Sequence, residues 1–285
     1  MEKIKQALER ARDAHTTIKS DGHRRTVVRQ VPEPEVTSKI TYTKTKSVEI
    51  SKDQLREKWV IAGDTNDSIS DQYKLLRTHV LQRLKANQWN SLAVTSPNED
   101  CGKTLTSINL AISLAREVNH SVLLVDMDLR RPSIHRYFFT DEQPGISEYL
   151  TEDLELSEIL FNPDLERLVI LPGNKPFSNS SEMLSSPKMV QLVEELKNRY
   201  PNRIVIFDMP PLLSCDDMIA FSPYIDAIML VVEEGGTRKD ELKRAYELIE
   251  NSRVIGTVLN KSKDKSSSYV CVRQSHLYSR YPVVW

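Results

Sequence analysis

One stretch restricts the fold of this chain more than any other. In it, an apolar run leads through a turn into a helical pattern. Residues 92–94 are apolar, residues 96–101 have the composition of a turn, and residues 102–104 read Gly-Lys-Thr before a segment with helical apolar spacing. Backbone N–H groups of such a turn, together with the N-terminus of the next helix, bind phosphate groups. The stretch therefore predicts a strand, a phosphate-binding loop and a helix.

The residues of this loop have separate expected roles. Lys103 is expected to reach the β and γ phosphates of a nucleotide, and Thr104 to offer its hydroxyl to Mg²⁺. Only part of the motif G-x-x-x-x-G-K-[ST] is present, because Pro97 occupies the place of its first glycine. A surface turn is the alternative interpretation. The other residues expected to contact the nucleotide here are Asp100, Cys101, Gly102 and Leu105.

Two further apolar runs end in aspartate. Residues 122–125 lead into Asp126 and Asp128, and residues 204–207 lead into Asp208. Continuous apolar runs are typical of strands buried on both faces of a parallel sheet, whose carboxyl ends share one edge where ligands bind. Capping of a helix or turn is the alternative role of each aspartate. We expect the catalytic residues Lys103, Asp126, Asp128 and Asp208, with Mg²⁺ held by Thr104, Asp126 and Asp208.

The remaining periodicity predicts the rest of the fold. Apolar strands are expected at residues 167–172, 227–232 and 254–259, and helices between them at residues 188–200 and 238–251. Strands that alternate with helices indicate an α/β fold with a doubly wound, mostly parallel sheet. A further amphipathic helix is expected at residues 71–84, with Tyr73, Leu76, Val80 and Leu84 facing inward.

Three parts are expected along the chain. Residues 1–51 form an N-terminal helix and linker, residues 52–262 the α/β domain, and residues 263–285 a tail that holds Tyr269, Tyr278 and Tyr281. Both ends are basic: residues 1–30 carry eight Lys or Arg against four Asp or Glu, and residues 261–285 carry five against one. The remaining body is acidic and has no basic, aromatic stripe, so no nucleic-acid partner is expected.

Composition agrees with a globular protein of the cytoplasm. Hydrophobic residues make up 39% and charged residues 28% of the 285 residues, which suffices for a sizeable core. No run of 18 or more apolar residues occurs, so no membrane-spanning helix is expected. Cys101, Cys215 and Cys271 lack zinc-type spacing, and a reducing compartment is predicted.

At the level of motifs the chain resembles bacterial tyrosine kinases of the phosphate-loop class. The resemblance rests on Val-Leu-Leu-Val-Asp-Met-Asp-Leu-Arg-Arg-Pro at residues 122–132 and Ile-Phe-Asp-Met-Pro-Pro at residues 206–211. Similar stretches occur at residues 144–150, 182–184 and 254–260, and the likeness spans about residues 55–262. It implies a P-loop NTPase fold similar to that of MinD and ParA proteins. Residues 2–11 also look like the start of the short soluble form found in exopolysaccharide gene clusters.

The resemblance implies a function and its partners. A member of this family would use ATP and Mg²⁺ to phosphorylate the tyrosine cluster of its own tail, here Tyr269, Tyr278 and Tyr281, with the tail exchanged between subunits of a homo-oligomer. It would regulate synthesis and export of exopolysaccharide or capsule. A membrane polysaccharide co-polymerase, or chain-length determinant, would activate it and recruit it to the inner face of the plasma membrane. Asn260 would contact the adenine. Apart from the resemblance, either Arg130 or Arg131 could steady phosphate or phosphotyrosine as a two-pronged donor, and ion pairing at the sheet edge is their alternative role.

Other interpretations remain open at this point. The family's E-x-x-R-x-x-R pattern for ring assembly corresponds here to Asp71, Lys74 and Arg77, which could equally be a solvated charged face. A nucleotide-switched ATPase of the MinD and ParA type would have the same sheet. Its usual lysine, five positions before the loop lysine, is replaced by Asn98. A catalytically weak adaptor of a membrane polysaccharide complex is a third possibility, which Pro97 and Cys101 in the loop favour.

Overall fold

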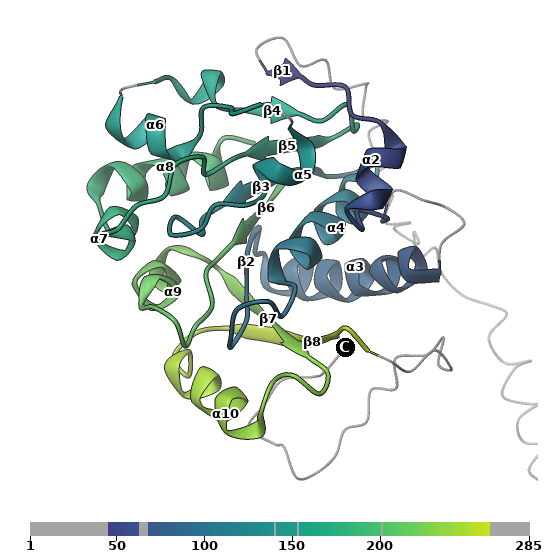
Figure 1. The fold of residues 1–285 in the computed structure, drawn as a ribbon, viewed down its shortest axis with the longest axis vertical. Coiled ribbons are helices and arrows are strands. Elements are labelled where there is room, and N and C mark those ends of the chain that lie inside the picture. The colour runs from purple at the N-terminus through teal and green to yellow at the C-terminus, as the bar shows by residue number, and fades with distance from the viewer. Residues whose placement is uncertain (1–44, 63–67, 140, 153, 201, 263–285) are drawn as a thin grey trace, which may run out of the picture. The chain divides into compact units, whose positions relative to one another are not determined.

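A parallel sheet covered by helices on both faces forms the core of the described part of the chain. The computed structural model describes residues 45–62, 68–139, 141–152, 154–200 and 202–262. Eight strands in this part join one sheet in the order β1-β4-β5-β3-β6-β2-β7-β8 (Figure 1). Neighbouring strands are parallel except for β4 and β5, which are antiparallel. The predicted α/β, doubly wound sheet is confirmed.

The bounds of the elements follow the predicted pattern closely. The strands are β1 (Lys46–Ser47), β2 (Ser91–Thr95), β3 (Ser121–Asp126), β4 (Phe161–Asn162), β5 (Leu168–Leu171), β6 (Arg203–Asp208), β7 (Ala227–Glu233) and β8 (Val254–Asn260). The longer helices are α3 (Ser68–Asn87), α4 (Lys103–Ala115), α8 (Pro187–Asn198) and α10 (Lys239–Leu248). The shorter helices are α2 (Lys52–Glu57), α5 (His135–Phe138), α6 (Ile146–Thr151), α7 (Ser180–Leu184), α9 (Asp217–Phe221) and the 3-10 turns η1 (Leu156–Glu158) and η2 (Ser222–Tyr224).

Strand residues alternate between two separate apolar cores. In β2, Leu92 and Val94 join the core beneath α3 and α4, whereas Ala93 joins the core beneath α8, α9 and α10. Figure 1 shows α2, α3 and α4 on one face of the sheet and α7, α8, α9 and α10 on the other. Burial on both faces explains why the strand sequences are continuously apolar rather than alternating.

The order of the central strands brings two predicted aspartates together. β6 lies between β3 and β2, and Asp126 at the end of β3 is the direct Cα partner of Asp208 at the end of β6. Val94, close to the end of β2, is the partner of Asp208 on its other side. The loop that follows β2 therefore starts beside both carboxylates.

Helix α3 extends the predicted helix by one turn or less at each end, and its inward face is confirmed. Val80 is fully buried and Leu84 nearly so, both in the core with α4. Arg77 is turned toward α4, where it donates to the Ser113 carbonyl at 3.1 Å and lies 3.0 Å from Glu117. Asp71 and Lys74 form an ion pair with each other at 2.7 Å. All three charges of the proposed assembly pattern thus have partners within the chain.

The predicted ends of the chain are only partly described. Residues 45–51, within the stretch predicted as linker, include β1, which pairs with β4, and Ser51, which caps α2. The predicted helix at residues 2–14 and the tail tyrosines Tyr269, Tyr278 and Tyr281 lie outside the described residues. Within the described ranges, no helix has the length and apolarity needed to cross a membrane.

A buried asparagine ties the segment before α3 to α4. Asn109 Oδ1 accepts the N–H groups of Ile61 and Ala62 at 2.8 and 2.9 Å, and its Nδ2 donates to the Trp59 carbonyl at 3.1 Å. We expect Asn109→Ala to lower the free energy of unfolding by about 3 kcal/mol, because two buried N–H groups lose their acceptor. Urea unfolding measures this. Asn87→Ala, which removes an exposed hydrogen bond within α3, is the control, and equal effects of the two changes would contradict the prediction.

Candidate active site

The loop between β2 and α4 has the geometry of an anion-binding loop. Gly102 adopts φ +85° immediately before α4, and no side chain caps the N-terminus of this 13-residue helix. The first N–H groups of α4 therefore remain available to an anion. Asn260 at the end of β8 donates through Nδ2 to the Cys101 carbonyl at 2.9 Å. The positive φ of residue 102 favours glycine, and a Cβ there would lie 2.2 Å from that nitrogen, so the Asn260 side chain would have to move.

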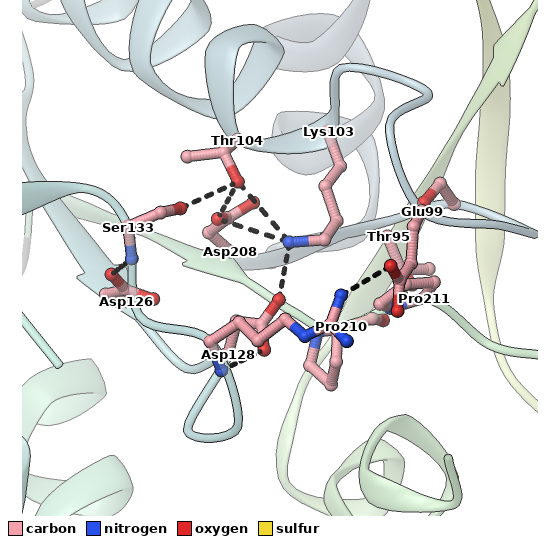
Figure 2. Close-up of polar contacts among 12 residues, drawn as sticks. Thr95, Glu99, Lys103, Thr104, Asp126, Asp128, Ser133, Asp208, Pro210 and Pro211 are labelled. Atoms are coloured by element: carbon pink, nitrogen blue, oxygen red, sulfur yellow. Dashed lines mark hydrogen bonds and ion pairs between the residues drawn. The ribbon is translucent and has the colours of Figure 1, made fainter. Parts of the chain in front are cut away.

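Lys103 extends from the start of α4 toward the carboxylates at the sheet edge (Figure 2). Its Nζ lies 2.7 Å from Asp128 Oδ2 and 3.8 Å from Asp208 Oδ2. Burial works against the charge of the lysine, but Asp208 and Asp128 together outweigh burial and raise the pKa of Lys103 above its ordinary value. Lys103 is therefore a largely buried ammonium, with 12% of its side chain exposed, and it is held by carboxylates.

Asp208 is fully buried and receives hydroxyl hydrogen bonds from one face of α4. Thr104 Oγ1 donates to Asp208 Oδ2 at 2.6 Å, and Ser107 Oγ donates to Asp208 Oδ1 at 3.0 Å. Burial raises the pKa of Asp208, although Lys103 and the Thr104 hydroxyl act in the opposite direction. Ser107 was not predicted. Its position four residues after Lys103, on the same face of the helix, is the signal that could have found it.

Asp126 is also fully buried, but it faces a different part of the backbone. Its Oδ2 accepts the N–H groups of Ser133 and Ile134 at 2.8 and 2.9 Å, and no partner is present for its buried Oδ1 in the described structure. Burial, and then the charge of Asp208, raise the pKa of Asp126 to about 7. Figure 2 shows Ser133 between Asp126 and Thr104, and its Oγ lies 3.5 Å from Thr104 Oγ1.

The charge balance of this edge suits a bound cation. Three buried aspartates, Asp126, Asp128 and Asp208, surround one ammonium, that of Lys103, and Asp126 Oδ1 lacks a donor. Among the described residues, no group of three or more His, Cys, Asp or Glu could enclose a metal by itself. Mg²⁺ is bound in proteins by one or two carboxylates and completes its shell with water and phosphate oxygens, and Asp208 with the neighbouring Thr104 hydroxyl offers oxygen donors of this kind. The residues present therefore fit the ion.

The other predicted residues lie around the same edge. Asp100 is exposed with φ +57°, and Cys101 is buried with its Sγ 3.7 Å from Thr237 Oγ1. Leu105 packs against the core on the α3 side of the sheet. Arg130 forms an ion pair with Asp217 at the start of α9.

A cavity of about 570 Å³ opens at the opposite end of the sheet. Its lining includes Asn90, Arg203 and Asp226, which precede or begin β2, β6 and β7. The catalytic candidates lie at the carboxyl ends of β3 and β6 instead. The candidate active site therefore lies at the carboxyl edge, where ligands of open parallel sheets bind, and not at this cavity.

The buried carboxylate of Asp126 predicts a pH dependence of stability. Its pKa rises from 3.8 to about 7 on folding, so the native state holds a proton that the unfolded state has lost between these values. Stability therefore falls as pH rises through this window. Asp126→Asn keeps an oxygen for the Ser133 and Ile134 N–H groups and cannot ionise.

We expect the free energy of unfolding of Asp126→Asn, relative to that of the parent chain, to be higher at pH 8 than at pH 5 by about 1 kcal/mol or more. Urea unfolding of both proteins at the two pH values measures this difference. A constant difference across the range would show that Asp126 does not titrate there.

The fold and the site first define a broad class. A family model described as "AAA domain" matches residues 92–252, more than half of the chain, and the loop at residues 96–104 lies within it. The structure resembles the kinase domain of Escherichia coli tyrosine kinase ETK, with a TM-score of 0.67 and 26% identity over 79% of this chain and 91% of that domain. The class is that of P-loop nucleotide-binding proteins.

Curated relatives narrow the class to one family. Tyrosine-protein kinase YwqD of Bacillus subtilis is 31% identical over 203 residues, which are 70% of this chain and 84% of that protein. Tyrosine-protein kinase ptk of Acinetobacter johnsonii is 30% identical over 213 residues, which are 74% of this chain but 29% of that longer protein. The chain belongs to the bacterial tyrosine kinase family.

Proposed function

We propose that this chain is an ATP-dependent protein-tyrosine autokinase that phosphorylates Tyr269, Tyr278 and Tyr281 of its own C-terminal segment. The observation that carries the proposal is the position of Lys103 Nζ, 2.7 Å from Asp128 and 3.8 Å from Asp208, at the uncapped N-terminus of α4. In phosphoryl transfer, the protein mainly positions the γ phosphate and neutralises its negative charge, and it takes little part in the covalent chemistry. This edge offers both.

Nucleotide binding would exchange one partner of Lys103. The N–H groups of the loop and of the first turn of α4 take the phosphates, and Lys103 turns its amine from Asp128 toward their β and γ oxygens. Thr104 and Asp208, the latter through water, would hold Mg²⁺ beside Asp126. The ion supplies neutralisation of the charge that builds on the transferred phosphoryl group. Asn260, already attached to the Cys101 carbonyl, stands beside the loop where the adenine would lie.

The acceptor phenol needs a base near the phosphoryl group. Tyrosine has a pKa of about 10 in water, so a carboxylate that accepts its proton as the new bond forms accelerates transfer. Asp126 has a buried oxygen without a donor, which supports this role. Once Lys103 has moved to the phosphates, Asp128 also loses its cation and borders the same space.

The setting of this reaction is part of the same proposal. Transfer would occur in trans, with the tail of one subunit entering the site of another. A partner of the membrane co-polymerase class would activate the kinase, and the reaction would regulate exopolysaccharide or capsule synthesis.

Mass spectrometry of the intact chain, before and after incubation with ATP and Mg²⁺, tests the proposal. We expect phosphate on the peptide that holds Tyr269, Tyr278 and Tyr281, and none in the variant with all three changed to phenylalanine. An activating partner fragment is included in a parallel sample. ATP hydrolysis with ATP-dependent dimers and unmodified tyrosines would favour a nucleotide-switched ATPase instead. Absence of nucleotide binding would favour an adaptor.

A further inference from the structure

Arg130 is held in place by a carboxylate of the protein interior. Its Nε lies 3.3 Å from Oδ1 of Asp217, the first residue of α9. The side chain of Asp217 is fully buried, whereas that of Arg130 is 41% exposed. The buried partner therefore fixes the inner edge of the guanidinium and leaves its outer edge open to solvent.

The ion pair with Asp217 uses Arg130 Nε and neither of the two terminal guanidinium nitrogens. In the described structure, Arg130 Nη1 and Nη2 have no protein partner. These two nitrogens form the planar fork that binds two oxygens of a phosphoryl group at once. Arg131 differs, because its Nη1 is engaged by Glu99 of the phosphate loop and its side chain is 73% exposed. Of the two adjacent arginines, only Arg130 combines a fixed stem with a free fork.

The position of Arg130 is on the Asp128 side of the site. Cys215 lies near enough to both residues for each to affect the pKa of its thiol, which burial raises to about 11. Asp128 in turn contacts Lys103 at 2.7 Å. The fork of Arg130 thus belongs to the same edge as the phosphate-handling lysine, on the side where α9 begins.

We propose that Arg130 binds the phosphoryl oxygens of the phosphotyrosine product, and that Asp217 is the positioning residue that aims it. This inference rests on the proposed tyrosine kinase function. The acceptor segment itself indicates which oxyanion the fork meets, because residues 265–285 contain neither Asp nor Glu. A tail of this composition offers Arg130 no side-chain carboxylate until a phosphoryl group has been attached to a tyrosine.

Calorimetric titration of the full, dephosphorylated chain with N-acetyl-O-phosphotyrosine amide, in the presence of saturating Mg·ADP, tests the first half of the inference. We expect Arg130→Gln to weaken binding by roughly tenfold or more, the range for hydrogen bonds to charged groups. Arg130→Lys should restore little, because an ammonium lacks the fork. The matched control is Arg131→Gln, which should bind the probe within about twofold of the parent chain. The Mg·ADP affinity of each variant is measured separately, so that every titration is run at a nucleotide concentration that saturates that variant.

The role of Asp217 is tested by a double-mutant cycle. Asp217→Asn should weaken binding of the same probe, and Arg130→Gln with Asp217→Asn together should bind no more weakly than Arg130→Gln alone, because Asp217 acts through Arg130. A purely structural role would make the effects additive. Thermal melting of each variant shows whether it is folded. Arg130→Gln leaves the buried Asp217 carboxylate without its cation, and the double variant removes that unpaired charge.

The outcomes separate this inference from the proposed function. Equal affinity of the parent chain and Arg130→Gln for the probe, or no binding by the parent chain, overturns the inference. Tighter binding of N-acetyl-aspartate amide than of the phosphotyrosine probe also overturns it, in favour of an acidic peptide ligand. Failure of the parent chain to bind Mg·ATP would instead overturn the proposed function, while the phosphotyrosine titration without nucleotide would still report on Arg130.

Discussion

Lys103→Met is expected to abolish phosphotyrosine formation, with a loss of at least about a thousandfold, because the ammonium that pairs with Asp128 and Asp208 is removed. Methionine has a similar length and no charge, so it retains the packing of the side chain but not its attraction for the γ phosphate. The measurement is the rate at which phosphate appears on the tail tyrosines, followed by intact mass.

A control separates loss of chemistry from loss of structure in this variant. Lys243→Met changes an exposed lysine of α10 whose partner is Glu247, and should phosphorylate the tail at the parental rate. Lys103→Met leaves Asp128 and Asp208 without their cation, so thermal melting is measured beside activity. A folded Lys103→Met protein that still labels its tail at more than about a tenth of the parental rate would contradict the proposed role of Lys103.

Asp208→Asn is expected to lower the phosphorylation rate by about 10²–10³, the usual effect of removing one preorganised electrostatic group. Asparagine has the shape of aspartate and can still accept a hydrogen bond from Thr104 or Ser107, but it lacks the charge that would attract Mg²⁺. The rate should partly recover when the Mg²⁺ concentration is raised, because the lost charge weakens binding of the ion. Steady-state phosphorylation over a range of Mg²⁺ concentrations measures this.

Ser107→Ala provides the graded comparison for Asp208. It removes one hydrogen bond to Asp208 Oδ1 and leaves the carboxylate, so its effect on rate should be about tenfold or less, with no change in the Mg²⁺ requirement. A larger loss in Ser107→Ala than in Asp208→Asn would show that the orientation of Asp208 matters more than its charge.

In the helix at residues 71–84, hydrophobic periodicity predicted the buried face but not the partners of the charged residues. Its inward apolar face was predicted correctly, because burial of every third or fourth residue is a local property of a helix. The same periodicity does not indicate which residues its charged side chains contact. Arg77 reaches Ser113 and Glu117 of the neighbouring α4 region, and no local pattern states which helix lies beside α3.

In the candidate site, too, some residues were predicted from the sequence and others were missed. The loop residues and the aspartates at strand ends were predicted, because buried parallel strands and a Gly-Lys-Thr turn leave clear local patterns. Ser107 and the anchoring of Arg130 by Asp217 were missed. The second of these joins residues 87 positions apart in the chain, and sequence patterns of strand or helix length contain no information at that separation.

Local sequence patterns sufficed to predict the class of fold, the loop at residues 96–104 and the aspartates at the ends of the strands. Local burial and backbone preferences act over a few residues, and those are the features they control. Strand order and the choice of ion pairs became known from the folded chain: β6 lies between β2 and β3, so Asp126 stands directly beside Asp208, and Lys103 has Asp128 as its nearest partner. Strand order and ion-pair choice depend on packing between distant segments, which each segment's own sequence does not specify.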